Sequence, residues 1–342
     1  MALTLTVGRR HPLAREILRA LGVLAASLLV FPLLGINLIE AIPSVYRGTL
    51  ANPYALSQTI TIAAVLTLAA GAALVPLRAN FVNLGGEGQI TMGAVAAIAV
   101  ALGLGGGGST MSAVLCLVAA AIAGALWGGF AGALHERFGA NAVITTLMFN
   151  YIAFAIAGYI RSAVWPDDVS PQTEPVPADT ALPQFGDLGA APVAAAVAVA
   201  VWLLLIWLLL RTNFGFRLRA TGDNASASSR FGYHPARVRL WAVLLGGALA
   251  GLGGGLLVLI LNRALIASIA SNYGYVGIAA ALLIGLRPAL LPLGAIAFAV
   301  MTVGGSTLSA VARVSPDVAL VGVSAAVLVL LASRSTKSGG QG

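Results

Sequence analysis

The sequence predicts an all-α fold, a polytopic transmembrane helix bundle with about ten spanning segments. Of the 342 residues, 59% are hydrophobic and only 9% are charged, whereas a soluble domain carries about a quarter charged residues. Apolar runs long enough to cross about 30 Å of hydrocarbon recur along the whole chain. The alternating pattern of transmembrane barrel strands is absent from these runs. We therefore expect helices that cross a lipid bilayer.

The spanning segments follow from the apolar runs in chain order. The first is expected to be a retained helix, because its apolar stretch continues to about Ile39 and exceeds the length of a signal-peptide core. The eighth is short. The ten runs lie near residues 17–37, 55–77, 82–104, 111–134, 142–163, 191–211, 239–261, 273–286, 289–309 and 317–333. They predict a single transmembrane domain over residues 1–342.

The distribution of Lys and Arg predicts the orientation of these segments. If the N-terminus lies inside, 15 of the 19 basic residues fall in inside segments. The four others are Arg47, Arg161, Arg263 and Arg313. Because Lys and Arg concentrate in cytoplasmic loops, we expect both termini to be cytoplasmic.

Two loops are large, and they are predicted on opposite sides of the membrane. Loop 164–190 is acidic and rich in proline, so we expect an irregular external cap with at most short helices. Loop 212–238 is basic and cytoplasmic, and its residues 223–229 suit a short helix with Asp223 or Asn224 as N-cap. Such a helix serves either as a lipid-surface anchor or as a docking helix for a soluble partner.

Composition argues against an enzyme, a metal site and nucleic-acid binding. A phosphate-binding loop needs a lysine after its glycines, and the only lysine is Lys337, so any ATP and Mg²⁺ must be bound by another chain. The histidines, His11, His135 and His234, all fall in cytoplasmic segments, away from any serine within the bilayer. The single cysteine, Cys116, allows no intrachain disulfide and no metal-ligand cluster. The net charge of +8 is confined to short segments between apolar runs, so we expect no nucleic-acid partner.

A polar stretch inside the membrane contains the first candidate site residues, Asn83, Glu87 and Gln89. Glu87 follows Arg78, which marks the inner surface, by nine positions. Counted as helix, this places Glu87 up to roughly 13 Å deep. A carboxyl at that depth should face a cavity or a partner. Two interpretations stay open: these residues line a substrate pathway, or Glu87 caps a helix start while Asn83 bonds a neighbouring helix.

Further candidates for the pathway combine amide and aromatic side chains. Asn150 and Tyr151 lie midway along the fifth predicted helix, and Asn272, Tyr273 and Tyr275 lie at the outer start of the eighth. These groups could stack on and hydrogen-bond a nucleobase or a sugar. Tyrosines at the membrane interface also serve as anchors, so this alternative stays open for Tyr273 and Tyr275.

Two series of glycines spaced four apart predict close helix contacts. One series lies in the fourth predicted helix and the other in the seventh. Small residues at this spacing let helix backbones approach in a membrane. The two series are Gly124, Gly128 and Gly132, and Gly247, Gly251 and Gly255.

Several motifs together resemble one known family, the permease subunits of ABC importers for nucleosides and simple sugars, within the wider branched-chain amino acid/monosaccharide permease group. The resemblance spans roughly residues 80–310. Its motifs are residues 81–89 (FVNLGGEGQ), 125–128 (ALWG), 141–152 (NAVITTLMFNYI), 171–173 (PQT), 217–224 (RLRATGDN) and 273–283 (YGYVGIAAALL). Residues 81–89 have one more residue between Phe and Asn than the family pattern, and Ala142 stands where the family has Glu.

The resemblance implies the role and the partners of the chain. It would carry nucleosides, or simple sugars, inward across a bacterial cell membrane. It would pair with a second permease as a heterodimer, with cytoplasmic ATP-binding subunits, and with an external substrate-binding protein. The residues implied to couple to the ATPase are Arg219, Gly222, Asp223, Asn224, Ser226, Arg230 and Gly232. Ser226 replaces an acid of the family pattern, so this contact would rely on Arg219 and Arg230.

Two other functions are compatible with the residues. A secondary transporter could use Glu87 as a proton relay, because a lone deep carboxyl suits such a relay. Its uptake would collapse with the proton gradient and survive depletion of ATP. A membrane scaffold or receptor without transport would show no effect of Glu87→Ala on uptake.

Overall fold

The computed structural model describes residues 38–103, 110–178, 180 and 182–312, and they form a bundle of helices. Among these residues, the β-structure consists of an isolated antiparallel bridge between Pro166 and Thr173. The α-helices of the described residues are α2 (Leu38–Thr49), α3 (Pro53–Arg78), α4 (Gly86–Gly103), α5 (Thr110–Phe138), α6 (Ala142–Tyr159), α7 (Ala191–Arg211), α8 (Asn213–Asp223), α9 (Ala225–Arg230), α10 (Pro235–Leu256), α11 (Tyr273–Leu283) and α12 (Leu291–Ala312). Two π-helical segments extend α6 and α10, η1 (Ile160–Val164) and η3 (Leu257–Asn262), and the 3-10 turns are η2 (Gly186–Leu188) and η4 (Pro288–Leu290).

Among the described residues, seven helices are long and apolar enough to cross a membrane, in agreement with the predicted bundle of transmembrane helices. They are α3, α4, α5, α6 with η1, α7, α10 with η3, and α12. The predicted eighth segment is the shorter helix α11, which has 11 residues. The predicted first and tenth segments, 17–37 and 317–333, lie outside the described residues. The count of about ten and the side of the termini therefore stay predictions.

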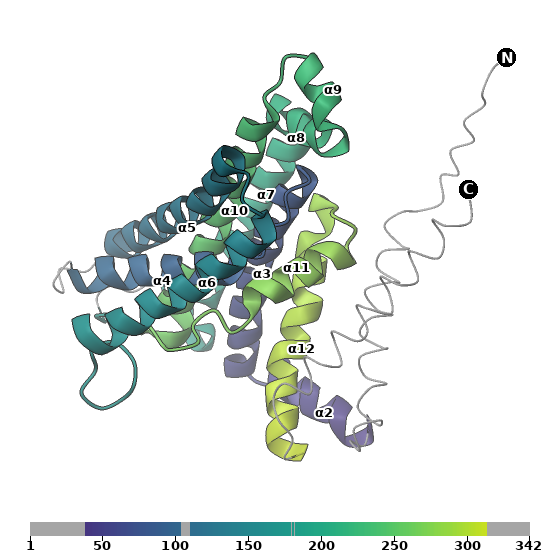
Figure 1. Ribbon diagram of the computed structural model, residues 1–342. Helices are drawn as coiled ribbons and strands as arrows, with labels where there is room; N and C mark the ends of the chain where they lie inside the picture. Colours follow the sequence, from purple (N-terminus) through teal and green to yellow (C-terminus); the bar gives the residue numbers. More distant parts are fainter. Residues whose placement is uncertain (1–37, 104–109, 179, 181, 313–342) are drawn as a thin grey trace.

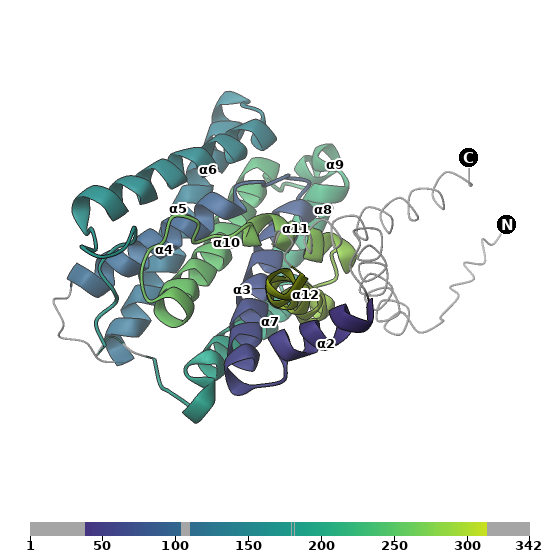
Figure 2. The same ribbon diagram turned by 90° about the horizontal axis from the view of Figure 1, so that it is seen from below.

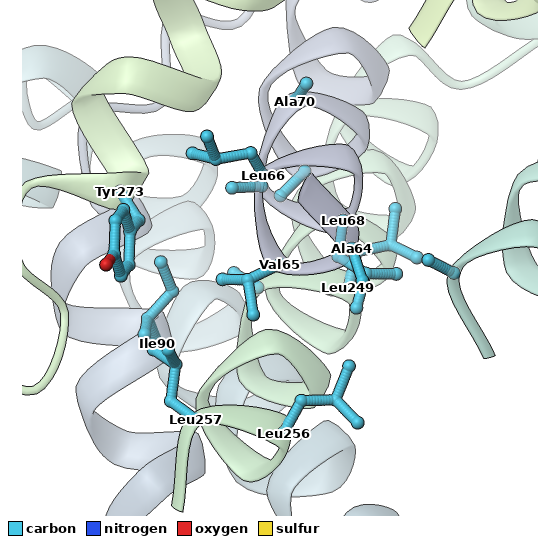
Figure 3. Packing of buried hydrophobic residues seen from close by; sticks show 14 of the residues in the cluster. Ala64, Val65, Leu66, Leu68, Ala70, Ile90, Leu249, Leu256, Leu257 and Tyr273 are labelled. Atoms are coloured by element: carbon cyan, nitrogen blue, oxygen red, sulfur yellow. The ribbon is translucent and has the colours of Figure 1, made fainter. Parts of the chain in front are cut away.

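Helix α3 forms the centre of the bundle. Its side chains are buried on nearly all faces, and Leu66 and Leu74 are fully enclosed. Figure 3 shows Val65 and Leu66 of α3 packed among Ile90, Leu257 and Tyr273 from three other helices. The central position of α3 follows from this burial on all sides, since an all-round apolar surface would suit lipid as well as a protein interior. Seen from below, α3 lies between α10, α11 and α12, while α6 and α2 lie at opposite edges (Figure 2).

The two predicted glycine series pack against each other, where α5 meets α10. A Cβ atom on Gly124 would collide with the carbonyl oxygen of Gly247, and one on Gly251 would collide with the carbonyl oxygen of Ala120. The backbones therefore touch, which confirms that these series are packing stripes. This contact connects α10 to α5 over a large part of their lengths.

The two large loops lie at opposite ends of α3, a helix about 39 Å long at 1.5 Å per residue. Near the start of α3, Ser57 donates a hydrogen bond to the carbonyl of Leu188 in loop 164–190 (2.9 Å). At its other end, the carbonyl of Arg78 contacts Gly222 of α8 so closely that a Cβ there would collide. Figure 1 shows α8 and α9 projecting beyond one end of the bundle, with the loop after α6 at the other.

Loop 164–190 is irregular, as the sequence predicts, and side-chain hydrogen bonds order it. Asp167 accepts hydrogen bonds from Ser170 (2.6 Å) and Gln172 (3.3 Å). The Ser170 hydroxyl is the main reason that the pKa of Asp167 lies below its ordinary value. Arg263, which follows η3, donates to the carbonyls of Val176 and Pro177 at 3.1 and 3.2 Å. The loop is thereby fixed to the end of α10.

Candidate functional site

The candidate site is built on a break in the chain between α3 and α4. Residues 79–85 are not helical, and Asn80 has a positive φ of 56°. The helical rise used to estimate the depth of Glu87 therefore does not apply to residues 79–85, and the depth of Glu87 in the membrane stays a prediction. The break is ordered locally by Asn83, whose side-chain oxygen accepts the N–H of Gly85 at 2.9 Å. Helix α4 then begins at Gly86.

Glu87 is buried in the first turn of α4, where its side chain is only 3% exposed. One carboxyl oxygen accepts the main-chain N–H of Gly274 at 2.6 Å and that of Tyr275 at 3.4 Å. These N–H groups belong to the first turn of α11, whose own helix offers them no acceptor. Glu87 thus caps a helix start, as one of the two interpretations expected, and the helix that it caps is α11.

Glycines make this contact between α4 and α11 possible. A Cβ on Gly274 would lie 2.5 Å from the main-chain nitrogen of Glu87. A Cβ on Gly86 would lie 3.2 Å from the Cα of Gly274. The first distance is too short for a real Cβ, so glycine is needed at Gly274, whereas a Cβ on Gly86 would be tight and would need its neighbour to shift by a few tenths of an ångström. The glycines of residues 81–89 therefore serve close packing as well as the break.

Asn83 and Gln89 are buried together beside the break. The two amides face each other, with nitrogen-to-oxygen distances of 3.3 and 3.4 Å. Gln89 also packs against α5, because a Cβ on Gly128 would lie 2.8 Å from its side-chain nitrogen. These amides satisfy each other inside the bundle, which is how polar groups are accommodated at a buried position.

Asn150 of α6 connects the break to α11. Its side-chain oxygen accepts the N–H of Gly88 at 2.8 Å. Its side-chain nitrogen donates to the carbonyl of Leu84 (2.9 Å) and to the hydroxyl oxygen of Tyr275 (3.1 Å). One amide therefore joins α6, α4 and α11. Because the Tyr275 oxygen accepts this bond, the Tyr275 hydroxyl proton can point to another acceptor.

The structure brings five of the eight predicted pathway residues together around the break, in two hydrogen-bonded groups: Asn83 with Gln89, and Tyr275 with Glu87 and Asn150. Tyr273 is buried in the hydrophobic core beside them (Figure 3). Tyr151 is 62% exposed, on another face of α6 from buried Asn150, and its ring lies against Phe154. Asn272 is exposed and precedes α11 with a φ of 64°.

Two residues that contact the break or α11 were not among the predicted site residues. Arg78 donates two hydrogen bonds to the carbonyl of Leu286, at 2.8 and 3.1 Å, just beyond the end of α11. Thr146 accepts the N–H of Leu84 at 3.1 Å. Thr146 lies within the motif 141–152, which was a usable signal. For Arg78 the signal was its place at the end of an apolar helix directly before the motif 81–89.

Arg78 and Glu87 hold the two ends of α11. The carboxyl of Glu87 lies at its N-terminus, and the guanidinium of Arg78 binds a carbonyl beyond its C-terminus. This arrangement matches the helix dipole, which favours negative charge at the start and positive charge at the end. The short helix is thereby fixed to both sides of the break between α3 and α4.

The predicted coupling residues lie on α8, α9 and the turn after them. Asn224 is the N-cap of α9, and its side-chain oxygen accepts the N–H of Ala227 at 2.9 Å, which confirms the predicted capped helix. Gly232 ends the segment with a φ of 82°, a value that favours glycine. The polar residues of this set are exposed: Arg219, Asp223, Asn224, Ser226 and Arg230. Gly222 instead contacts the end of α3.

Among the described residues, no group of three His, Cys, Asp or Glu side chains could hold a metal ion. Glu136 at the end of α5 forms an ion pair with Arg239 of α10, and its carboxyl also lies 3.8 Å from a ring nitrogen of His135. Both oxygens of Glu136 bind the Arg239 guanidinium. This pair connects two helix ends on the side of α8 and α9, and it is part of the scaffold.

Comparison with known proteins identifies the family. The profile described as the branched-chain amino acid transport system permease component matches residues 54–332, most of the chain. The chain belongs to this permease family. The permease is 29% identical to the glucose ABC transporter permease TsgB13 of Haloferax volcanii over 306 residues, 85% of this chain and 80% of that protein. It is 30% identical to the guanosine ABC transporter permease NupP of Bacillus subtilis over 268 residues, 77% and 76% of the two chains.

A third relative is the nucleoside ABC transporter permease NupB of Lactococcus lactis, 25% identical over 311 residues, 88% of this chain and 85% of that protein. No solved structure matches the permease. The family and the seven apolar helices confirm the predicted role: this is a multi-pass transmembrane permease of an ABC importer. The permease is therefore not itself the enzyme of the transporter.

Proposed function

We propose that the permease imports a nucleoside, with a simple sugar as the alternative solute. The observation that supports this most directly is its similarity, over about three quarters or more of each chain, to permeases named for guanosine, nucleosides and glucose. The exposed aromatic groups of α6 and α11, Tyr151 and Tyr275, would suit a flat base or the face of a sugar ring.

In this proposal ATP is bound and hydrolysed by a separate cytoplasmic subunit that docks on α8 and α9. A cytoplasmic position for this end of the bundle is supported by the basic residues, of which 15 fall in segments predicted inside and four in segments predicted outside. Ser226 offers no carboxylate to an ATPase, whereas Arg219 and Arg230 are exposed and charged. A second permease would form a heterodimer with this chain in a bacterial cell membrane, and an external binding protein would deliver the solute to the side of loop 164–190.

The proposal includes a route by which movement of α8 would reach the candidate site. Gly222 of α8 rests on the carbonyl of Arg78, and the side chain of Arg78 holds the end of α11. The start of α11 carries Tyr275, which bonds to Asn150. A shift of α8 against the end of α3 would therefore displace α11 relative to α6. Coupling of this kind requires a packed element whose position depends on both the ATPase contact and the solute site. In this proposal α11 is that element.

Uptake by cells that make the permease with its ATPase and binding protein tests the function. Radiolabelled guanosine and glucose are compared after depletion of ATP and after collapse of the proton gradient. We expect guanosine uptake that ATP depletion abolishes, and a lower affinity for guanosine in Tyr275→Phe but not in the control Tyr159→Phe, a tyrosine exposed at the end of α6. Uptake that survives without ATP and stops with the proton gradient would instead support a proton relay through Glu87.

A further inference from the structure

A cavity of about 380 Å³ lies at the end of α3 that contacts loop 164–190. Its wall combines polar and apolar groups. The polar side chains are Ser57, Gln184 and Arg263, and the apolar ones are Ala190, Leu259 and Ile260. A cavity of this size holds a small ligand, and a mixed wall suits a ligand with one polar and one apolar part. No residue of the candidate site lines this cavity.

Arg263 supplies the positive charge of the cavity. Its main chain has a φ of 57°, an uncommon conformation for a residue other than glycine. Its guanidinium donates hydrogen bonds to the carbonyls of Leu259 (3.3 Å), Val176 (3.1 Å) and Pro177 (3.2 Å). These bonds use at most three of the five N–H groups of the guanidinium. At least two N–H groups are therefore left for another acceptor.

The charge of Arg263 is not neutralised by a carboxylate of the described residues, since none of them forms an ion pair with it. Burial lowers the pKa of Arg263 below its ordinary value, because a charged guanidinium loses hydration there. An anion in the cavity would replace the lost hydration. The planar fork of a guanidinium matches a phosphate group, which it binds through two parallel hydrogen bonds. The chemistry of Arg263 therefore favours a phosphate.

Exposed aromatic side chains place the cavity at the level of the membrane surface. Tyr54, in the first turn of α3, is 72% exposed and lies three positions before Ser57, on the same side of the helix. Tyrosine rings are typical of the headgroup level of a bilayer. Phe185 follows Gln184 of the cavity wall and is 54% exposed, a position that lipid would cover. Lipid headgroups are therefore expected at the height of the cavity.

The helix beside the cavity faces lipid. Helix α7 begins at Ala191, directly after Ala190 of the cavity wall. Its exposed large side chains are aliphatic or aromatic: Val199, Leu203, Leu204, Trp207 and Leu210. Helix α6, which carries Asn150 of the candidate site, lies on the other side of α3 from α7 (Figure 2). A ligand that enters the cavity from the side of α7 therefore comes from the bilayer.

The acids near the cavity favour a headgroup that also carries a positive charge. Loop 164–190 contains five acids and no Lys or Arg. One of these acids, Asp187, is exposed and lies two positions before Gly189 of the cavity wall. An ammonium group can face these carboxylates while the phosphate of the same headgroup binds Arg263. A headgroup with a net negative charge lacks this match.

We propose that the cavity binds one membrane phospholipid, with its phosphate on Arg263 and its glycerol and first acyl carbons against Leu259 and Ile260. The headgroup that fits the charges is phosphatidylethanolamine, whose ammonium faces Asp187. The bound lipid occupies the space between loop 164–190, α3 and η3, and it stabilises the loop against the bundle. This site does not depend on which solute the permease imports.

The test measures phospholipid on the purified permease by native mass spectrometry, after production in cells whose membrane contains phosphatidylethanolamine and phosphatidylglycerol. Ala178→Trp fills the cavity from an exposed position of its wall and keeps Arg263. Its control is Ala200→Trp, at an exposed position of α7 outside the cavity. Arg263→Gln removes the charge. Its control is Arg161→Gln, because Arg161 also holds loop 164–190, through the carbonyl of Pro171 at 2.8 Å.

We expect one bound phosphatidylethanolamine on wild type and on both controls. Binding should weaken by at least about tenfold in Ala178→Trp, where a side chain occupies the cavity, and in Arg263→Gln, where the phosphate loses a charged donor. After removal of lipid with detergent, dihexanoyl phosphatidylethanolamine should bind again more tightly than dihexanoyl phosphatidylglycerol. Inorganic phosphate should not displace it.

Wild type without bound phospholipid, or Ala178→Trp with as much phospholipid as wild type, overturns the inference. Displacement of the lipid by inorganic phosphate would show a general anion site in its place, and displacement by guanosine would show a site for solute. Tighter binding of phosphatidylglycerol would overturn the assignment of the headgroup. Ala178→Trp is decisive where Arg263→Gln loosens the loop, because it leaves the bonds of Arg263 to the loop in place.

Discussion

At the residue scale, Glu87 joins two helices that are far apart in the sequence. Its buried carboxyl accepts two main-chain N–H groups at the start of α11. A negative charge at a helix N-terminus is stabilising, and buried N–H groups without an acceptor are costly. The first role of Glu87 is therefore to hold α11 against α4. A role in the solute pathway would be additional to it.

This role predicts different effects for two substitutions of Glu87. Glu87→Ala removes the acceptor for Gly274 and Tyr275 and should lower the free energy of unfolding by about 1–3 kcal/mol. Glu87→Gln keeps an acceptor oxygen for these N–H groups, so its loss of stability should stay below about 1 kcal/mol. Thermal unfolding of the purified permease in detergent measures both. Equal stability of Glu87→Ala and wild type would contradict the capping role.

The sequence predicted which residues interact only where the two residues lie close together in the chain. The cap of α9 by Asn224 involves Ala227, three positions away, and the sequence pattern indicated it. The partner of Glu87 lies 187 positions away, and that of Arg78 lies 208 positions away. No periodicity or motif spacing specifies such a pair, because the pairing depends on how α11 packs between α3 and α4.

At the scale of elements, hydropathy placed the helices but not their neighbours. The eight predicted segments that fall on described residues each coincide with a helix, whereas α2 was not predicted because it is short, amphipathic and contains Pro43. Helices α3 and α7 are both strongly apolar, yet α3 is central and α7 peripheral. Lipid is as apolar as a protein interior, so hydropathy alone cannot separate these positions.

The contact between α5 and α10 predicts that Gly251 is sensitive to substitution, in contrast to a glycine outside this contact. Gly251→Ala would place a Cβ against the carbonyl of Ala120, and such overpacking should destabilise the permease by about 1–3 kcal/mol. Gly158→Ala in α6 is the control, because its Cβ would meet no atom within 4 Å. That change should be neutral or stabilising by up to about 1 kcal/mol. Thermal unfolding checks both, and equal effects of the two substitutions would refute the packing stripe.

At the scale of the whole molecule, α3 connects the two large loops. Its start contacts loop 164–190 through Ser57, and its end contacts α8 through the carbonyl of Arg78. A helix of 26 residues is long enough to cross a bilayer, so the loops should lie on opposite membrane faces. The structure thus agrees with opposite sides for the two loops, while the cytoplasmic identity of the α8–α9 end rests on the basic residues.

Labelling of single cysteines with a membrane-impermeant maleimide tests this orientation. The background is Cys116→Ala, which removes a single buried cysteine and should leave no site for the reagent. Val169→Cys, at a position 93% exposed in loop 164–190, should react in intact cells. Ser226→Cys, at an exposed position of α9, should react only after the membrane is permeabilised. The reverse pattern would place α8 and α9 outside the cell, where no ATPase could dock on them. Reaction of both cysteines in intact cells would instead show that the two loops share one side, because an impermeant reagent cannot reach residues separated from it by the bilayer.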